Sequence, residues 1–160
     1  MPDTAEVVGY FDGLCEAAYP GGPRNPGGCA CGGWWAEPFT HEGAEVHIAG
    51  HRHYCTGEGA TNNMAEYSAA LDCLRALYRA GYRGAVLLRG DSQLVVKQYS
   101  GEFACNKDHL RALRDQLRHA ATFFSSVRLE WIPRDQNTRA DALAWRAHEQ
   151  ETGLKSSRPH

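Results

Sequence analysis

The chain has 160 residues, 42% hydrophobic and 22% charged, a balance typical of one globular domain long enough to bury a core. Its formal net charge of -2 excludes recognition of a polyanion through bulk positive charge, so any nucleic-acid site has to be a local patch. No apolar run approaches a membrane span and the opening MPDTAEVV lacks signal-peptide character, so we expect a cytoplasmic monomer without membrane contact.

The first part of the chain predicts three consecutive strands. Residues 5–12 are rich in β-branched and aromatic side chains, as expected for a strand. The glycine- and proline-rich residues 19–28 predict a loop. Residues 31–36 and 45–54 predict two further strands, joined by a turn at residues 38–43. Such short links favour antiparallel pairing.

The rest of the chain alternates helices and strands. Apolar residues recur at helical spacing from Met64 to Gly81, and Thr61, Asn62 and Asn63 supply candidate N-caps. The later elements are predicted as a strand (84–89), two helices (92–98 and 106–122), a strand (127–132), a turn (133–137) and a helix (138–150). This order predicts an α/β fold: a mixed five-stranded sheet, three antiparallel strands and then alternating helix and strand, with helices on both faces.

We expect one domain over residues 1–150 and a polar, disordered tail over residues 151–160. Six cysteines raise the question of disulfides or zinc, and without a secretion signal reduced thiols are expected. Cys29-Ala-Cys31 and His51-Arg-His53-Tyr-Cys55 contain zinc-ligand residue types, but their spacing differs from the usual gap of about two to four residues. Alternating positions also arise on one face of a strand, which favours a strand over a zinc site.

Four acidic residues are poorly explained by a fold alone. Asp12 and Asp91 fall at the ends of predicted strands, where Asp is unfavourable and an unpaired buried charge is costly. Glu66 and Asp141 fall in the predicted first turns of helices, beside apolar positions. Each has an ordinary explanation, because acids in a first turn complement the helix dipole and Asp often precedes a turn.

Taken together, the four acids predict a metal site. In α/β sheets, ligands gather at the ends of central strands and at neighbouring helix termini, so these acids can converge. Converging carboxylates repel one another unless cations neutralise them, and ligands that are all oxygen suit Mg²⁺ or Mn²⁺ rather than zinc. A carboxylate cage for two hard cations is the apparatus of two-metal phosphodiester chemistry.

Four segments resemble, in order, the catalytic blocks of type 1 ribonuclease H: YFDGLCE, TNNMAEYSAALDCL, LLRGDSQLVVKQ and WIPRDQNTRADALAW. The match spans roughly residues 6–148 and implies the ribonuclease H-like fold. It implies that two Mg²⁺ ions, or Mn²⁺ in their place, are held by the catalytic acids Asp12, Glu66, Asp91 and Asp141. The implied reaction is hydrolysis of the RNA strand of an RNA–DNA hybrid, leaving 5′-phosphate and 3′-hydroxyl ends.

The resemblance also implies a set of substrate contacts. The positions that match contacts to the RNA strand in the minor groove, where 2′-hydroxyls are displayed, are Cys15, Asn62, Asn63 and Gln93. Thr61 and Asn106 match positions that hold a DNA phosphate, and the start of a helix after Asn106 favours anions. Helix capping is an alternative role for Thr61 and Asn62, and both roles can coexist. The neighbouring candidates are Gly13, Ser92, Lys107 and Arg111.

A basic row follows Asn106. Its members, Lys107, Arg111, Arg114 and Arg118, recur at helical steps opposite a leucine stripe, so we expect them to face outward. The row is either a phosphate-contacting patch or an ordinary solvated face interleaved with Asp108 and Asp115. Three tryptophans are expected in the core or on the sheet face rather than as base-stacking platforms, namely Trp34, Trp35 and Trp131.

The sequence departs from better-known members of the family in two ways. The loop before Asp141, PRDQNTRA, has no histidine where they carry a His loop, and Arg134 or His148 are candidates to replace it. The basic protrusion is absent, because only a few residues separate Gln98 from Asn106. The same chemistry on double-stranded RNA or on single-ribonucleotide junctions is therefore an alternative. A non-catalytic nucleic-acid-binding module is less favoured, because all four acids are present.

Overall fold

The computed structural model describes residues 6–155 of the chain. Within these residues the strands are β1 (Val7–Glu16), β2 (Cys29–His41), β3 (Ala44–Thr56), β4 (Ala85–Gly90) and β5 (Ser126–Trp131). The helices are α1 (Asn62–Arg79), α2 (Gln93–Ser100), α3 (Asp108–Ala121), the short 3₁₀ helix η1 (Arg134–Gln136) and α4 (Thr138–Thr152). Apart from η1, which replaces the predicted turn, the predicted order of elements is confirmed.

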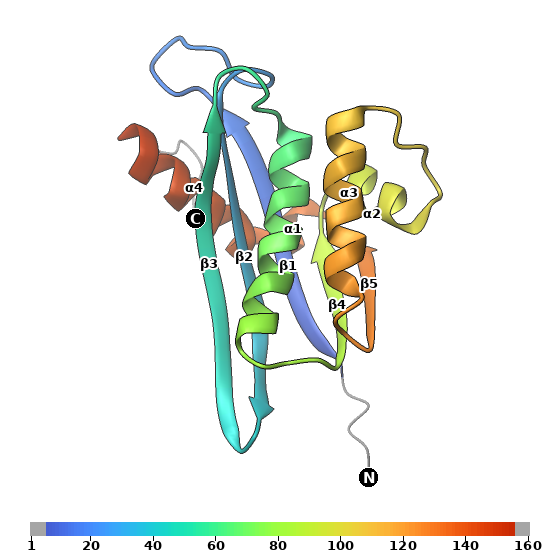
Figure 1. Ribbon diagram of the computed structural model, residues 1–160. Helices are drawn as coiled ribbons and strands as arrows, with labels where there is room; N and C mark the ends of the chain where they lie inside the picture. The colour runs from blue at the N-terminus through green and yellow to red at the C-terminus, as the bar shows by residue number, and fades with distance from the viewer. Residues whose placement is uncertain (1–5, 156–160) are drawn as a thin grey trace.

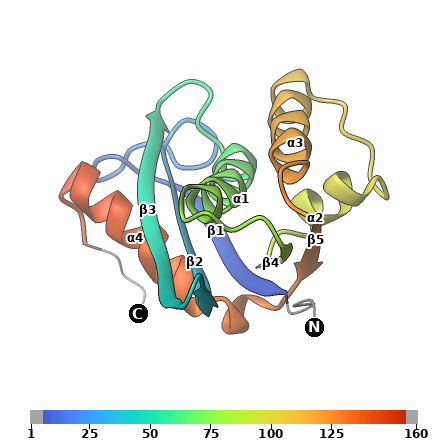
Figure 2. The same cartoon turned by 60° about the horizontal axis from the view of Figure 1, so that its bottom comes forward.

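The strands form one mixed sheet in the order β3-β2-β1-β4-β5. β1, β2 and β3 pair antiparallel, and β4 pairs in parallel with β1 and with β5. Figures 1 and 2 show α1 and α3 on one face of the sheet and α4 across the other, as predicted. None of the helices within residues 6–155 is long and apolar enough to cross a membrane.

The main core lies between the sheet and the pair α1 and α3. It includes the fully buried side chains of Phe11, Leu74 and Leu88. A smaller cluster beneath α4 joins Leu14 of β1 to Trp145. Both faces of β1 are therefore covered, which makes the middle of this strand a low-dielectric environment for any side chain placed there.

Two glycines allow the helices to approach the sheet closely. A Cβ atom at Gly13 would lie 2.3 Å from the amide nitrogen of Glu66 in α1. A Cβ atom at Gly33 would lie 2.5 Å from the carbonyl oxygen of Ala140 in α4. Gly33 pairs with Asp12 across the β1–β2 ladder, so both helices press on the sheet at Asp12. These contacts bring the helix that carries Glu66 and the helix that carries Asp141 to the same point.

Several predicted boundaries are wrong. β1 does not end at Asp12 but continues to Glu16, because β2 pairs with it along that whole length. Glu66 is the fifth residue of α1 and lies beyond its first turn.

The hairpin between β2 and β3 is also tighter than predicted. Its turn is reduced to Glu42 and Gly43, whose φ angles of 51° and 80° are typical of a two-residue hairpin turn. Pro38 is accommodated within β2 because it falls in the register shift between Ala36 and Phe39.

The C-terminal helix is longer than predicted. α4 runs to Thr152, so residues 151–152 belong to the helix and not to the tail. The expected disorder of residues 156–160 lies outside the described residues.

Candidate active site

The sheet topology brings the first two acids together. The last parallel pair between β1 and β4 joins Tyr10 to Arg89, and Asp91 follows directly after β4. Asp12 lies two residues beyond Tyr10 in the neighbouring strand, at the same end of β4. The two carboxylates therefore meet where β4 stops and β1 continues.

The other two acids come from the helices on opposite faces. One carboxylate oxygen from each of Asp12, Glu66 and Asp91 lies within 4.8 Å of the other two. Asp141, in the first turn of α4, lies close enough to Asp12 that its charge raises the pKa of the Asp12 carboxyl. The four acids that the sequence singled out therefore converge on one site.

The cluster is electrostatically costly without a counter-charge. Burial raises the pKa of Asp12 well above its ordinary range, and the charges of Glu66, Asp91 and Asp141 raise it further. Burial and the charge of Asp91 likewise raise the pKa of Glu66, and burial raises the pKa of Asp91. These shifts mean that the folded chain holds the fully ionised cluster at a cost.

The donor set fits a hard divalent cation. Oε2 of Glu66 is buried and has no hydrogen-bond partner among the described residues. Oδ1 of Asp12 accepts a hydrogen bond from the Gly13 amide at 3.0 Å, which fixes this carboxylate. A divalent cation bound by these oxygens would provide the missing partner of Glu66 and offset the mutual repulsion of the carboxylates.

Asn137 is a residue of this site that the sequence did not single out. Its side chain is 1% exposed, and its Nδ2 donates a hydrogen bond to the carbonyl oxygen of Phe11 at 2.9 Å. The backbone carbonyl oxygen of Asn137 accepts a hydrogen bond from the backbone amide of Asp141 at 3.1 Å. Asn137 thus links the backbone next to Asp12 to the backbone of Asp141. An asparagine before a helix predicts a cap, and only the folded structure shows that this side chain bonds across to β1.

Of the two candidates to replace the histidine of the family's loop, only Arg134 lies near the acids. Its positive charge acts on Glu66 and on Asp91, partly offsetting the effect of burial on the pKa of each. His148 is buried, with a ring nitrogen 2.9 Å from the carbonyl oxygen of Ala17 and its ring against Trp145. Its ring is thus enclosed in the core, which favours Arg134 over His148 as the replacement for the family's histidine.

Replacing Arg134 with glutamine is expected to shift the acidic limb of the pH–activity profile to higher pH. Without the cation, the pKa values of Glu66 and Asp91 rise, so both carboxylates ionise at higher pH. Arg134→Lys, which keeps the charge, is the matched control and should leave the limb in place. The profile of kcat/KM against pH checks this. An identical shift in both variants would show that shape rather than charge matters at this position.

The candidate substrate residues on the helices lie near helix starts. Thr61 caps α1, its Oγ1 accepting from the amide of Met64 at 3.2 Å, so the capping role is real. Ser92 caps α2 in the same way, accepting from Val95 at 3.2 Å. The two residues that begin α1, Asn62 and Asn63, are half-buried, and Gln93, Asn106, Lys107 and Arg111 are exposed. Figures 1 and 2 show α1 and α3 side by side and running in the same direction, so their N-termini lie at the same end of the molecule.

The two candidate substrate residues on β1 are buried instead. Gly13 lies beneath α1 and offers no side chain. Cys15 is fully buried, and its thiol donates to the carbonyl oxygen of Arg24 at 3.3 Å. Alternation along β1 turns the Cys15 side chain towards the cluster around Ala65, so the thiol itself is not exposed, and the RNA contact at this position stays a prediction.

The loop between β1 and β2 braces the start of α1, which the sequence did not indicate. Oδ1 of Asn25 accepts from the amide of Asn62 at 2.9 Å, and the amide of Gly27 donates to the carbonyl oxygen of Ala60 at 2.9 Å. Figure 1 shows this loop beside the start of α1. The segment that carries Thr61 and Asn62 is thus held by two hydrogen bonds from this loop. The pattern RNPGG indicated only a turn.

Two further predictions about side-chain orientation need correction. Arg114 and Arg118 are half-buried rather than outward-facing, because Arg118 bonds to backbone carbonyl oxygens and Arg114 pairs with Asp115. Trp131 is 43% exposed at the end of β5, and its Nε1 donates to the carbonyl oxygen of Asp91 at 3.3 Å. Trp34 and Trp35 are half-buried on the sheet as expected, and Trp35 stacks on Tyr10 at 4.5 Å.

A family model and two curated relatives match the sequence of this chain. A family model described as "Reverse transcriptase-like" matches residues 41–147. Over 145 residues the chain is 38% identical to ribonuclease HI of Halobacterium salinarum, covering 90% of this chain and 65% of that protein. Over 85 residues it is 40% identical to the bifunctional protein Rv2228c of Mycobacterium tuberculosis, covering 53% of this chain and 23% of that protein. The chain therefore spans less than two thirds of the length of either curated relative.

Solved structures agree with this fold. The crystal structure of RNase H1 from Halobacterium salinarum has a TM-score of 0.74 at 36% identity, over 91% of this chain and 99% of that chain. The N-terminal RNase H domain of Rv2228c gives 0.72 at 28% identity, over 92% and 98%. LC11-RNase H1, solved in complex with an RNA/DNA hybrid, gives 0.72 at 24% identity, over 91% and 98%, a likeness of fold alone. With a family model that matches more than half of the chain and a 36% identical relative covered almost end to end, the chain belongs to the ribonuclease H-like family.

Proposed function

We propose that the chain is a type 1 ribonuclease H, an endonuclease that hydrolyses the RNA strand of RNA–DNA hybrids. The observation that carries this proposal is the convergence of Asp12, Glu66, Asp91 and Asp141 from two strands and two helices on one buried point. The similarity to ribonuclease HI of Halobacterium salinarum supports this activity.

The four carboxylates would hold two Mg²⁺ ions, with Mn²⁺ as a substitute. When bound, such ions supply an activated water nucleophile and stabilise the charge that develops on the leaving 3′-oxygen, giving 5′-phosphate and 3′-hydroxyl ends. The chain's own contribution is positioning. Gly13 orients the Asp12 carboxylate through its amide, and Asn137 holds the start of α4 against β1.

The exposed and half-buried helix starts would hold the hybrid. Asn62, Asn63 and Gln93 offer amide side chains to the 2′-hydroxyls of the RNA strand, which distinguish RNA from DNA. Thr61 and Asn106 would hold a phosphate of the DNA strand near the start of α1 and α3, where free backbone amides favour anions. Ser92 and Lys107 lie next to these positions and complete the contact surface.

A strand-labelled substrate panel tests this proposal. Purified protein is incubated with an RNA–DNA hybrid, an RNA duplex and a DNA duplex carrying one ribonucleotide, each with Mg²⁺, Mn²⁺ or a chelator. We expect internal cuts in the RNA strand of the hybrid with either metal, and none with chelator. Preferred cutting of the RNA duplex or of the single-ribonucleotide duplex would replace the proposed substrate. Binding without metal-dependent cutting of any of the three would favour a non-catalytic module.

A further inference from the structure

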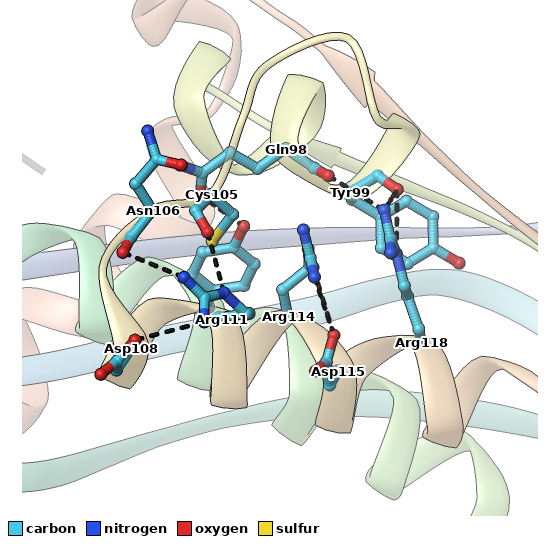
Figure 3. A network of polar contacts seen from close by, with 10 residues as sticks. Gln98, Tyr99, Cys105, Asn106, Asp108, Arg111, Arg114, Asp115 and Arg118 are labelled. Atoms are coloured by element: carbon cyan, nitrogen blue, oxygen red, sulfur yellow. Dashed lines mark hydrogen bonds and ion pairs between the residues drawn. The ribbon is translucent and has the colours of Figure 1, made fainter.

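The connection between α2 and α3, residues 101–107, carries Asn106 and is held by side chains that bond to its backbone. Figure 3 shows these contacts, in which Arg111 of α3 points back towards Cys105 and Asn106. Only a short segment without helix or strand separates α2 from α3. Such a segment is ordinarily mobile, and a substrate contact placed on it needs external support.

Arg111 supplies the first part of that support. Its Nε donates to the carbonyl oxygen of Cys105 at 3.1 Å and its Nη2 to the carbonyl oxygen of Asn106 at 3.1 Å. Its Nη1 pairs with Asp108 at 3.2 Å. All three guanidinium nitrogens are therefore engaged within the chain. This geometry favours a role in holding the backbone of the segment over a role in binding a phosphate directly.

Gln98 supplies the second part from the opposite side. Its side chain is 5% exposed, and its Nε2 donates to the carbonyl oxygen of Ala104 at 3.2 Å. Its Oε1 accepts from the hydroxyl of Tyr67 at 2.7 Å. Tyr67 is fully buried and directly follows Glu66 in α1. A chain of hydrogen bonds thus runs from the helix that carries a candidate catalytic acid to the segment that carries Asn106.

We propose that Arg111 and Gln98 are positioning residues for Asn106. They hold the backbone of residues 104–106 so that the Asn106 side chain stands at a fixed separation from the acid cluster. The ligand at Asn106 is a backbone phosphate of the strand that is not cut. This inference rests on the proposed function, and it replaces the direct substrate contact expected of Arg111 with an indirect one.

A double-mutant cycle between Arg111→Gln and Asn106→Ala tests the inference. KM and kcat are measured on a labelled hybrid at several salt concentrations for the wild type, both single variants and the double variant. We expect each single variant to raise KM about tenfold, as for the loss of a hydrogen bond to a charged group, with kcat nearly unchanged. The KM of the double variant should be no higher than the higher KM of the two single variants, because both changes remove the same phosphate contact.

Salt dependence separates this result from direct phosphate binding. A positioning role leaves the slope of log KM against log salt unchanged, because Asn106 is neutral. A direct contact by Arg111 would lower that slope by about one unit and make the two substitutions additive in log KM, and either outcome overturns the inference. Gln98→Leu provides a second route, and an unchanged KM in that variant also contradicts it.

Arg83→Gln is the matched control. Arg83 also donates to two backbone carbonyl oxygens, those of Tyr78 and Tyr82, but they lie at or just after the C-terminal end of α1 and outside the segment of residues 101–107. We expect this variant to lower Tm and to leave KM unchanged. The same cycle is measured as Kd for uncut hybrid in chelator. If the wild type binds hybrid without cutting it, the proposed catalysis is wrong. The Kd values of the four proteins still show whether Arg111 positions Asn106.

Discussion

Asp12→Asn is expected to stabilise the metal-free protein at neutral pH, because the folded chain holds the ionised Asp12 carboxylate at a cost that a neutral amide does not have. The raised pKa of Asp12 has burial as its main cause and the other acids as the second. In acid solution the carboxyl is protonated in both the folded and the unfolded chain, so it costs no stability. As pH rises above the ordinary pKa of Asp, the unfolded chain releases the proton first and the folded state loses stability. The variant has no proton to release at this position.

Chemical denaturation in chelator from pH 4 to pH 8 checks this expectation. The wild type should lose stability across that range more steeply than Asp12→Asn. Added Mg²⁺ should raise the Tm of the wild type and have little effect on the variant, since bound cation stabilises only the folded cluster. Equal pH dependence in the two proteins would mean that Asp12 is not held at a cost and would undermine the metal site.

Asn137→Ala is expected to lower kcat by about 10- to 100-fold, because small misplacements of catalytic groups have effects of this size. The change removes the hydrogen bond that ties the start of α4 to the carbonyl of Phe11, next to Asp12. Loss of this buried hydrogen bond carries a stability cost of about 0.5–1.5 kcal/mol. Asp141 then loses its fixed position relative to Asp12.

The comparison for Asn137 is with Gln136→Ala, an exposed neighbour in η1. Steady-state kinetics and thermal unfolding are measured for both variants. Gln136→Ala should behave as the wild type in both. If Asn137→Ala lost stability but kept the wild-type kcat, the residue would support the fold without positioning the acid.

The features that the sequence predicts well are local ones. Apolar residues at helical spacing after a Thr cap predict α1. An apolar strand that stops at Gly90 predicts that Asp91 lies at a strand end. Each of these depends on a few neighbouring residues. The convergence of the acids is less local, and it was predicted from strand ends, helix starts and the family resemblance.

The features that the sequence does not predict depend on distant partners. β1 passes Asp12 because β2 continues to pair with it, and no residue near Asp12 encodes that pairing. Cys15 faces α1 rather than solvent for the same reason, since the longer strand fixes its side. The roles of Asn137 and Arg111 depend on carbonyl groups that the fold brings close, and a helical pattern shows only that Arg111 lies on one face of α3.

The central claim is that the acid cluster cuts RNA in a hybrid with the help of divalent metal, and Asp91→Asn tests it most directly. Single-turnover cleavage of a hybrid labelled in its RNA strand is measured in Mg²⁺ for the wild type and the variant, together with hybrid affinity in chelator. We predict a loss of at least about 1,000-fold in cleavage, since metal-assisted charge stabilisation accounts for several kcal/mol of the barrier. Hybrid affinity should be retained. Cleavage by Asp91→Asn at the wild-type rate would contradict the account.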